Sequence, residues 1–264
     1  MRSRRVHSAN ADFQLALSLR DNRKQRARRR RFLVEGVRAI DAAVAAGWSI
    51  DAFWHAERAT LSRWALAHLD REAARTAYEL PPALLAELSE RDEPSELVAV
   101  AELPPDDLAR IPVRERGLVV VFDRPALPGN VGSVIRSADA LGADGVVVTG
   151  HAADPYDPQA VRAALASFFA LPVVRAERPR DVAAHLPGYR VVGTSARAET
   201  AVDAADLTAA TALVVGNETR GLSAAWRELC DELVAIPMIG AATSLNAAAA
   251  AAVLLYEAAR QRRA

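Results

Sequence analysis

The chain has 264 residues, of which 51% are hydrophobic and 25% charged, a composition typical of a soluble globular protein with one large or two ordinary domains. Acidic and basic residues number 33 each, so net charge does not indicate a nucleic-acid partner, and only the distribution of charge can do so. The single Cys230 excludes an intrachain disulfide, and the five histidines lack metal-ligand spacing. We expect a cytoplasmic, reducing location and no metal.

No stretch of the sequence predicts export or membrane insertion. The amino terminus is too polar for a signal peptide. The most apolar stretch, residues 247–256, is too short and too alanine-rich to span a bilayer. We therefore expect no membrane partner.

The first hundred residues predict a small α/β unit. Apolar periodicity indicates helices at residues 11–20, 36–46 and 82–88, and strands at residues 32–34, 50–54, 76–78 and 97–100. The proline-rich, acidic tract at residues 102–112 is typical of a linker. We place a first domain at residues 1–105, a linker at 106–116 and a second domain at 117–264.

Positive charge is concentrated in residues 20–31, where eight of twelve residues are basic and one is acidic. A run this dense either binds phosphates of a nucleic acid or forms a solvated charged face. Its arginines are weaker indicators of bidentate recognition than usual, because Lys24 is the only lysine in the chain and arginine is the general cation here.

The second domain alternates strictly between short apolar runs and helical segments, which indicates a parallel sheet covered on both faces. Strands are predicted at residues 117–122, 146–148, 173–174, 190–192, 213–215 and 232–236. Helices are predicted at residues 131–141, 158–168, 180–185, 223–229 and 244–260.

Residues 130–148 (NVGSVIRSADALGADGVVV) combine a helix with a polar start and the strand that follows it. Asn130 can cap this helix, Arg136 lies two turns further on, and Gly142 ends it. Taken alone, the pattern is explained by an N-cap and a solvated arginine. The preceding DRPALPG, however, predicts a loop at the carboxyl end of a strand, where open parallel sheets bind ligands.

Two later segments have the same polar character after a strand. GNETRGLS (216–223) predicts a tight turn holding Glu218, followed by a helix capped by Ser223. IPMIGAATSLN (236–246) precedes the last helix, and Ser244 and Asn246 offer two caps where one suffices. A ligand-binding role would explain why the segment carries a second polar side chain that the helix does not need as a cap.

Together the three segments resemble the signature motifs of the SpoU/TrmH family of RNA 2′-O-ribose methyltransferases. FLVEG (32–36) and SELVAV (95–100) extend the resemblance to the family's substrate-binding domain. The resemblance implies a small α/β RNA-binding domain followed by a parallel-sheet domain with a deep trefoil knot. It also implies that the cofactor is S-adenosylmethionine and that the protein is a homodimer. The expected reaction is methyl transfer to RNA, with ribosomal RNA preferred over tRNA as the substrate.

The resemblance assigns roles residue by residue. The catalytic candidates are Asn130, Arg136, Glu218, Ser244 and Asn246. The cofactor-binding candidates are Thr194, Ser195, Ala196, Gly216, Asn217, Gly221, Ile236, Met238, Ser244 and Leu245. The RNA-binding candidates are Arg20, Arg23, Lys24, Arg26, Arg28, Arg29, Arg30 and Arg31.

The sequence departs from the family pattern in two places. Ala164 and Ala166 follow Arg162 where a small polar pattern is usual, and Asn217 replaces a serine while keeping hydrogen-bonding capacity. Because free guanidinium stays protonated, we expect a charged Arg136 to hold a phosphate and stabilise developing negative charge, with the proton leaving through that phosphate, Glu218 or water.

Two readings from other classes remain. The chain could be a non-catalytic RNA-binding protein, since residues 20–31 would bind phosphates without chemistry. It could also be a nucleotide-binding α/β enzyme unrelated to RNA. The sequence has no GxGxxG or GxxxxGK[ST] after any predicted strand, which counts against the second reading.

Overall fold

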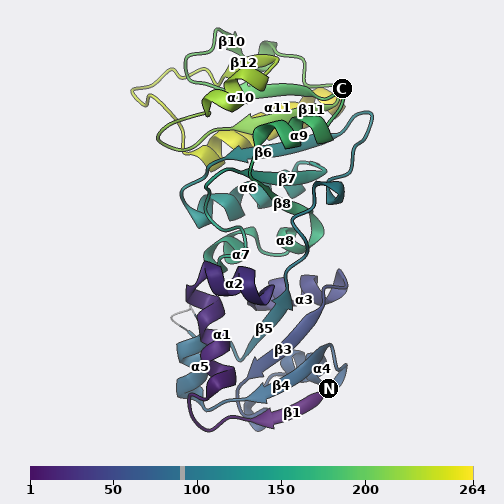
Figure 1. The fold of residues 1–264 in the computed structure, drawn as a ribbon, viewed down its shortest axis with the longest axis vertical. Coiled ribbons are helices and arrows are strands. Elements are labelled where there is room, and N and C mark those ends of the chain that lie inside the picture. The colour runs from purple at the N-terminus through teal and green to yellow at the C-terminus, as the bar shows by residue number, and fades with distance from the viewer. Residues whose placement is uncertain (90–92, 264) are drawn as a thin grey trace. The chain divides into compact units, whose positions relative to one another are not determined.

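The computed structural model describes residues 1–89 and 93–263 (Figure 1). It contains two compact units. The amino-terminal unit comprises Met1–Pro104 together with Tyr156–Phe169, and the carboxyl-terminal unit comprises Pro105–Pro155 together with Ala170–Ala264.

The amino-terminal unit is a mixed five-stranded sheet with helices. Its strand order is β1-β4-β3-β5-β2, and β5 runs antiparallel to both of its neighbours. The strands are β1 (Arg2–Arg5), β2 (Arg31–Glu35), β3 (Ile50–His55), β4 (Ala74–Glu79) and β5 (Leu97–Glu102). The helices are α1 (Ala11–Asp21), α2 (Arg23–Arg29), α3 (Val37–Ala45), α4 (Arg63–Asp70) and α5 (Pro82–Leu88).

All seven elements predicted for this unit are confirmed, while β1, α2 and α4 were not predicted. β1 is an edge strand of the sequence RSRR with every residue exposed, so it lacks the apolar alternation that marks a strand. α2 is almost wholly basic and buries only Arg26. Its start is set by Asn22, whose side chain accepts from the amides of Lys24 and Gln25.

The segment Tyr156–Phe169 packs against the amino-terminal sheet. The ring of Phe32 on β2 lies 5.1 Å from Tyr156 and 5.7 Å from Phe168, and Trp48 Nε1 donates to the carbonyl of Phe169 at 3.3 Å. The single helix predicted at residues 158–168 is wrong: α7 (Pro158–Ala164) ends at Leu165, whose φ is 55°, and α8 (Ser167–Ala170) follows. This break turns Phe168 and Phe169 into the core.

The carboxyl-terminal unit is a seven-stranded sheet in which every strand pair is parallel, as predicted. Its strand order is β10-β12-β9-β11-β6-β7-β8. The strands are β6 (Leu118–Asp123), β7 (Gly145–Thr149), β8 (Val173–Ala176), β9 (Arg190–Thr194), β10 (Thr200–Ala201), β11 (Thr211–Val215) and β12 (Glu232–Ala235). The two-residue β10 was not predicted.

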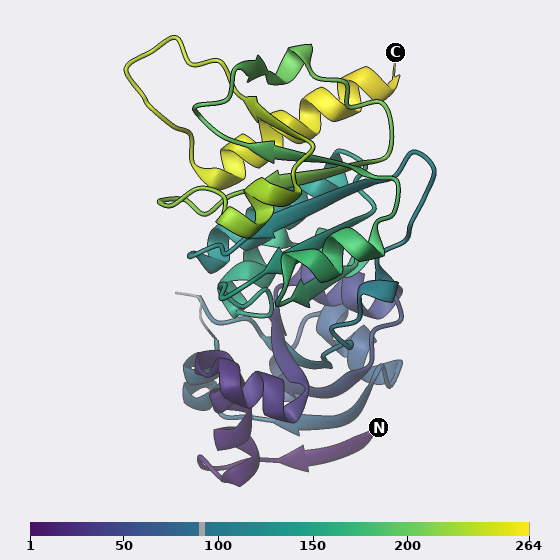
Figure 2. The ribbon, with the colours of Figure 1, turned by 45° about the horizontal axis from the view of Figure 1, so that its top comes forward.

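Two pairs of helices cover this sheet. α6 (Pro128–Ala140) packs on α11 (Ala247–Arg263), and α9 (Pro179–His185) packs on α10 (Ala224–Leu229), on the opposite face (Figure 2). Buried valines and alanines of β6, β7, β9 and β11 form a core with Trp226 of α10. Strands buried on both faces are the reason for the unbroken valine runs.

Candidate active site

The three polar motifs lie at one edge of the carboxyl-terminal sheet. β6 and β11 are parallel neighbours, and β11 is followed along the sheet by β9 and β12. The loops that leave the carboxyl ends of these strands therefore emerge side by side. The α6 motif follows β6, residues 216–223 follow β11, and residues 236–246 follow β12.

A chain of hydrogen bonds joins one side chain from each motif. Asn130 Nδ2 donates to Glu218 Oε1 at 2.8 Å, and Asn246 Nδ2 donates to Asn130 Oδ1 at 3.2 Å. The second Glu218 oxygen accepts from the amide of Ala126 at 3.1 Å. The structure thus brings together three of the five catalytic candidates, and it fixes the direction of the Glu218 carboxylate.

The capping role expected for Asn130 is wrong. Pro128 starts α6 two residues earlier, the N-cap is Leu127, and this cap makes no side-chain hydrogen bond. Proline favours the first helical position because its fixed φ suits the helix and its missing N–H is not needed there. Asn130 therefore lies in the first turn of α6. Its side-chain amide forms hydrogen bonds with Glu218 and Asn246 and does not cap the helix backbone.

At the last helix, Asn246 is the cap. α11 starts at Ala247 rather than at Ser244, and Asn246 Oδ1 accepts from the amides of Ala248 and Ala249 at 2.9 and 3.4 Å. Asn246 thus binds the helix through its oxygen and Asn130 through its nitrogen. Ser244 is exposed and makes no hydrogen bond with the described residues, so its hydroxyl is left for a ligand.

Residues 216–223 form a tight loop, which we call the glutamate loop. Asn217 and Gly221 exchange two backbone hydrogen bonds of 3.1 and 2.9 Å. Asn217 Oδ1 accepts from the amides of Thr219 and Arg220 at 3.0 Å each, and its Nδ2 donates to the carbonyl of Arg124 at 2.7 Å. The Asn217 side chain therefore shapes the loop that carries Glu218.

Asp123 and Arg124, which the sequence analysis did not select, anchor this loop. Asp123 is only 1% exposed and accepts from the amide of Ser223 at 2.7 Å and from Thr149 Oγ1 at 3.3 Å. Arg124, with a positive φ of 52°, pairs with Asp123 at 3.2 Å and donates to the carbonyl of Gly221 at 3.1 Å. An acid at the end of an otherwise apolar strand, LVVVFD, is the signal that could have found it.

Arg136 does not join this hydrogen-bonded chain. It is exposed on α6 and makes no hydrogen bond or ion pair within residues 1–89 and 93–263. It lies six residues after Asn130, and at 100° per residue this separation directs it about 120° away around the helix. Its guanidinium is thus available to a phosphate or to another chain.

The cofactor-binding candidates lie at the carboxyl ends of three adjacent strands. Thr194 ends β9, and the amide of Ser195 donates to the carbonyl of Val234 on β12 at 3.0 Å. Residues 237–246, which we call the terminal loop, are all exposed and project from the sheet (Figure 2). Met238, Ile239 and Leu245 of this loop are large apolar side chains in solvent, with Ile239 fully exposed. Such a loop has the character of a surface that a ligand or another chain covers.

Cys230 lies beneath β9. Burial, and to a lesser extent the charge of Asp231, raises the pKa of its thiol to about 11. A Cβ at Gly193 would lie 2.5 Å from Cys230 Sγ, so the sulfur fills the space that this glycine leaves. Its role is packing.

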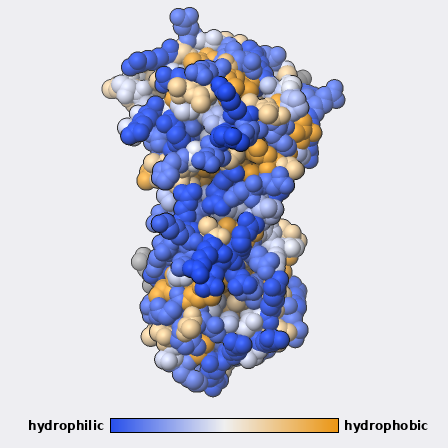
Figure 3. Space-filling model, viewed as in Figure 1, coloured by the Kyte–Doolittle hydropathy of each residue, from blue (hydrophilic) through white to orange (hydrophobic). Residues whose placement is uncertain are grey.

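The RNA-binding candidates form the end of α1, α2 and the start of β2, where Figure 3 shows strongly hydrophilic side chains over α2. Arg23, Lys24, Arg28 and Arg29 are exposed there. Arg20, Arg30 and Arg31 are tied to Asp21, the carbonyl of Leu103 and Asp51.

Arg26 is different from the rest of the run. It is 2% exposed, donates to the carbonyls of Leu19 and Arg20 at 2.9 and 2.8 Å, and pairs with Asp157 at 3.1 Å. These contacts leave it facing the interior of the unit. Its position gives it a structural role, and we omit it from the RNA-binding set.

Comparison with known proteins gives matches over both units. A family model described as the SpoU rRNA Methylase family matches residues 117–256, and one described as the SpoU L30e-like domain matches residues 10–99. A 23S rRNA (uridine(2479)-2'-O)-methyltransferase of Streptomyces viridochromogenes is 50% identical over 98% of this chain and 93% of its own length. The 23S rRNA (guanosine(2553)-2'-O)-methyltransferase RlmP of Bacillus subtilis is 31% identical over 89% of this chain and 90% of its own.

A solved structure shares the fold. It is the SpoU methyltransferase AviRb from Streptomyces viridochromogenes in complex with the cofactor AdoMet, and it superposes with a TM-score of 0.91 at 50% identity, covering 97% of this chain and 99% of its own.

In the part of the present chain that the structure describes, no helix combines the length and apolar character needed to cross a membrane. Over the same residues, no group of three or more histidine, cysteine, aspartate or glutamate side chains is placed to hold a metal ion.

Proposed function

The chain belongs to the SpoU rRNA methylase family, and from this we propose that it transfers a methyl group from S-adenosylmethionine to a ribose 2′-hydroxyl of ribosomal RNA. The observation that carries the proposal is the hydrogen-bonded chain through Asn246, Asn130 and Glu218, because it unites the three motifs at the ligand-binding edge of a parallel sheet. Two relatives act on 23S rRNA, and we propose the same RNA for this chain.

The loops at this edge have the chemistry that S-adenosylmethionine requires. The apolar side chains Met238, Ile239 and Leu245 are exposed in the loop that follows β12, and we propose that they cover the purine ring of the cofactor. When bound, the cofactor supplies an electrophilic methyl group on a sulfonium. We propose that residues at three places hold it: Thr194, Ser195 and Ala196; Gly216, Asn217 and Gly221; and Ile236, Met238, Ser244 and Leu245.

A 2′-hydroxyl is a weak nucleophile, so this chain must align it and ease the loss of its proton. Glu218 is fixed by Asn130 and the amide of Ala126, and each carboxylate oxygen has a second lone pair for another donor. We propose that Glu218 accepts the hydrogen of the 2′-hydroxyl, while Asn130, Asn246 and Ser244 orient the ribose.

Arg136 requires a different placement, because it points away from Asn130 on α6 and is exposed. We propose that the protein works as a homodimer in which Arg136 completes the site of the second copy, holding the phosphate next to the target ribose. Mixing the Arg136→Ala and Glu218→Gln proteins tests this. Only a shared site gives one intact centre per mixed dimer and restores methyl transfer, whereas two preparations of Arg136→Ala mixed together stay inactive.

Arg136→Lys separates charge from geometry. Lysine keeps the positive charge but loses the planar fork, so cofactor binding is expected to be unchanged while single-turnover transfer slows about 100-fold. Near-wild-type rates for Arg136→Lys across pH 6 to 9 would exclude the bidentate role.

We propose further that the carboxyl-terminal unit contains the trefoil knot of the family and that the protein is cytoplasmic. What supports the knot is the family membership, together with the return of α11 from the far end of the sheet to pack on α6. Residues 117–264 would then bind the cofactor, with residues 1–105 binding RNA and residues 106–116 as the linker.

Within the first domain, we propose that Arg20, Arg23, Lys24, Arg28, Arg29, Arg30 and Arg31 contact RNA phosphates. Neutralising the exposed Lys24, Arg28 and Arg29 should weaken RNA binding and flatten its dependence on salt, because each lost contact removes about 0.7 to 0.9 from the log–log slope. If the slope of log affinity against log salt concentration is unchanged, α2 is a solvated charged face that does not contact RNA.

The test of the function uses the full chain, labelled S-adenosylmethionine and unmodified transcripts of 23S rRNA and of tRNA. We expect label in 23S rRNA, in a dinucleotide that resists alkaline hydrolysis because its 2′-oxygen is methylated. Label in tRNA alone would favour the tRNA alternative. RNA binding without transfer would favour a non-catalytic binding protein.

A further inference from the structure

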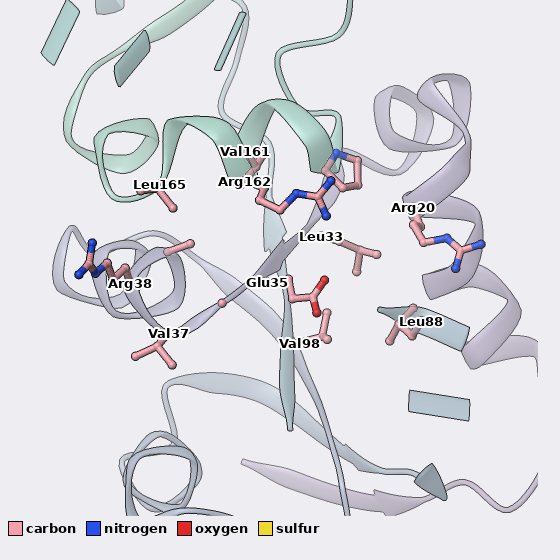
Figure 4. A pocket seen from close by; sticks show the side chains of 13 residues that line it. Arg20, Leu33, Glu35, Val37, Arg38, Leu88, Val98, Val161, Arg162 and Leu165 are labelled. Atoms are coloured by element: carbon pink, nitrogen blue, oxygen red, sulfur yellow. The ribbon is translucent and has the colours of Figure 1, made fainter. Parts of the chain in front are cut away.

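The amino-terminal unit contains a cavity of about 280 Å³, just below the roughly 300 to 1,000 Å³ of typical small-molecule sites (Figure 4). Its apolar lining comes from five elements. Leu33 and Val98 belong to neighbouring strands of the sheet, Leu88 ends α5, Val37 and Ala39 belong to α3, and Val161 and Leu165 belong to α7 and its end. The cavity, which we call the slot, therefore lies between the sheet, helices α3 and α5, and the segment Tyr156–Phe169.

Four charged side chains line the slot: Arg20, Glu35, Arg38 and Arg162. In Figure 4 the carboxylate of Glu35 lies near the middle of the cavity, Arg162 reaches over it from α7, and Arg20 and Arg38 lie on opposite sides. Three of the lining residues carry a guanidinium group and one carries a carboxylate, while Arg20 also pairs with Asp21 outside the lining. The excess of positive charge among the lining residues favours an anionic ligand.

Glu35 is held in direction by the protein. It ends β2, and its Oε1 accepts from the hydroxyl of the buried Ser89. The next residue, Gly36, has a φ of 98°, which side-chain-bearing residues rarely adopt, and it turns the chain at once into α3. The carboxylate is thereby presented to the slot as an acceptor.

The apolar side chains, the carboxylate acceptor and the arginines that line the cavity match the parts of one nucleotide. A base extruded from a single-stranded RNA packs its faces against apolar side chains, and a carboxylate accepts from an exocyclic amino group. The phosphates on either side of the base fit the guanidinium groups. Uracil has no amino group, so guanine, adenine and cytosine are the bases that suit Glu35.

The surroundings of the slot favour RNA over a free nucleotide. Arg20 lines the cavity and is also the first residue of the basic run that continues through Lys24, Arg28 and Arg29 on α2. A polynucleotide backbone that follows α2 therefore reaches the mouth of the slot. We propose that this cavity takes one unstacked, amino-bearing nucleotide of the substrate RNA. This inference rests on the proposed function and adds the site by which the amino-terminal unit selects its RNA.

Three variants of the full chain test the proposal with unmodified 23S rRNA transcript as the probe. Val161→Trp fills the slot, Glu35→Gln replaces an acceptor oxygen with a donor, and Arg162→Ala removes a guanidinium at the mouth. We expect each to weaken RNA binding about tenfold or more and to raise KM for RNA, with little change in kcat at saturating RNA. Arg63→Ala, an exposed arginine of α4 outside the cavity lining, is the matched control and should stay within twofold of wild type.

Chemical probing of the bound transcript identifies the nucleotide. Dimethyl sulfate reports on adenine and cytosine, kethoxal on guanine and carbodiimide on uracil. We expect one unpaired adenine, guanine or cytosine that is protected by the wild type and exposed again by Glu35→Gln. If the protected base is a uracil, or if Glu35→Gln and Val161→Trp, both folded by circular dichroism, bind RNA within twofold of wild type, the proposal is overturned.

Cofactor binding measured by calorimetry keeps this test separate from the function itself. The three cavity variants should bind S-adenosylmethionine as the wild type does, because the cofactor candidates all lie in the other unit. If the wild type neither binds the cofactor nor methylates RNA, the proposed function fails. The dependence of RNA affinity on Val161 and Glu35 would still decide whether the slot holds a nucleotide.

Discussion

The glutamate loop and the terminal loop leave neighbouring parts of the same sheet edge, yet they are built in opposite ways. The glutamate loop is tied by paired backbone hydrogen bonds, by Asn217 and by the buried Asp123 beneath it. Residues 237–246 are exposed throughout and bury no apolar side chain. The first loop holds the Glu218 carboxylate in a fixed direction before any ligand arrives, whereas the second presents exposed apolar side chains, which we propose are covered by cofactor or by a second copy.

The largest expected difference between the loops comes from adding one methyl group to each. A Cβ at Gly216 would lie 2.4 Å from the carbonyl carbon of Gly221, a backbone clash that the loop cannot absorb, whereas a Cβ at Gly240 meets nothing within 4 Å. We expect Gly216→Ala to destabilise the unit by about 3 kcal/mol and abolish transfer, and Gly240→Ala to change stability by less than about 0.5 kcal/mol. Urea unfolding followed by circular dichroism measures both. Equal stabilities would show that the glutamate loop is not tightly packed.

Removing the charge beneath the glutamate loop should have the next largest effect. Asp123→Asn loses the carboxylate that accepts from Ser223 and pairs with Arg124, so we expect a loss of about 2 kcal/mol in stability. Asp107→Asn is the control, because it removes an acid from an exposed cap outside this network. If Asp123→Asn unfolds at the same urea concentration as wild type, the network does not anchor the loop.

The smallest effect on the free protein is expected in the terminal loop. Ile239 is fully exposed, so Ile239→Ser should leave the stability of the free chain within about 0.5 kcal/mol of wild type. If cofactor or a second copy covers this side chain, the same variant weakens cofactor binding or dimer formation. Calorimetry and analytical ultracentrifugation report the two effects, and unchanged values in both would leave the loop without the role we give it.

The sequence predicted most of the elements that apolar periodicity defines, but it missed the amphipathic α4, which buries Ala65 and Leu69. It also missed elements that have no apolar pattern. The parallel sheet follows from buried valine runs such as those of β6 and β11. By contrast, α2 and β1 are basic and exposed, so no apolar pattern marks them. The break at Leu165 follows from the burial of Phe168 and Phe169 against the amino-terminal unit, a long-range packing that local propensity does not contain.

The candidate site shows the same limit. The three motifs indicated the right edge of the sheet, because carboxyl ends of neighbouring parallel strands must meet there. The partners of Asn130, which are 88 and 116 residues away, could not be read from its local pattern, and that pattern suggested a cap instead. Asp123 was missed although an acid ends the apolar run LVVVFD, and the groups that it binds, such as the amide of Ser223, are brought to it only by the fold.

The role of Glu218 is tested by single-turnover methyl transfer to 23S rRNA at saturating RNA and cofactor, for wild type, Asn130→Ala and Glu218→Gln. If Asn130 fixes Glu218 and Glu218 accepts the hydroxyl proton, both variants should transfer at least about 100-fold more slowly while binding S-adenosylmethionine as wild type does. Wild-type rates for Glu218→Gln would contradict the account, because they would remove the carboxylate from the chemistry and leave the chain of three side chains without a catalytic role.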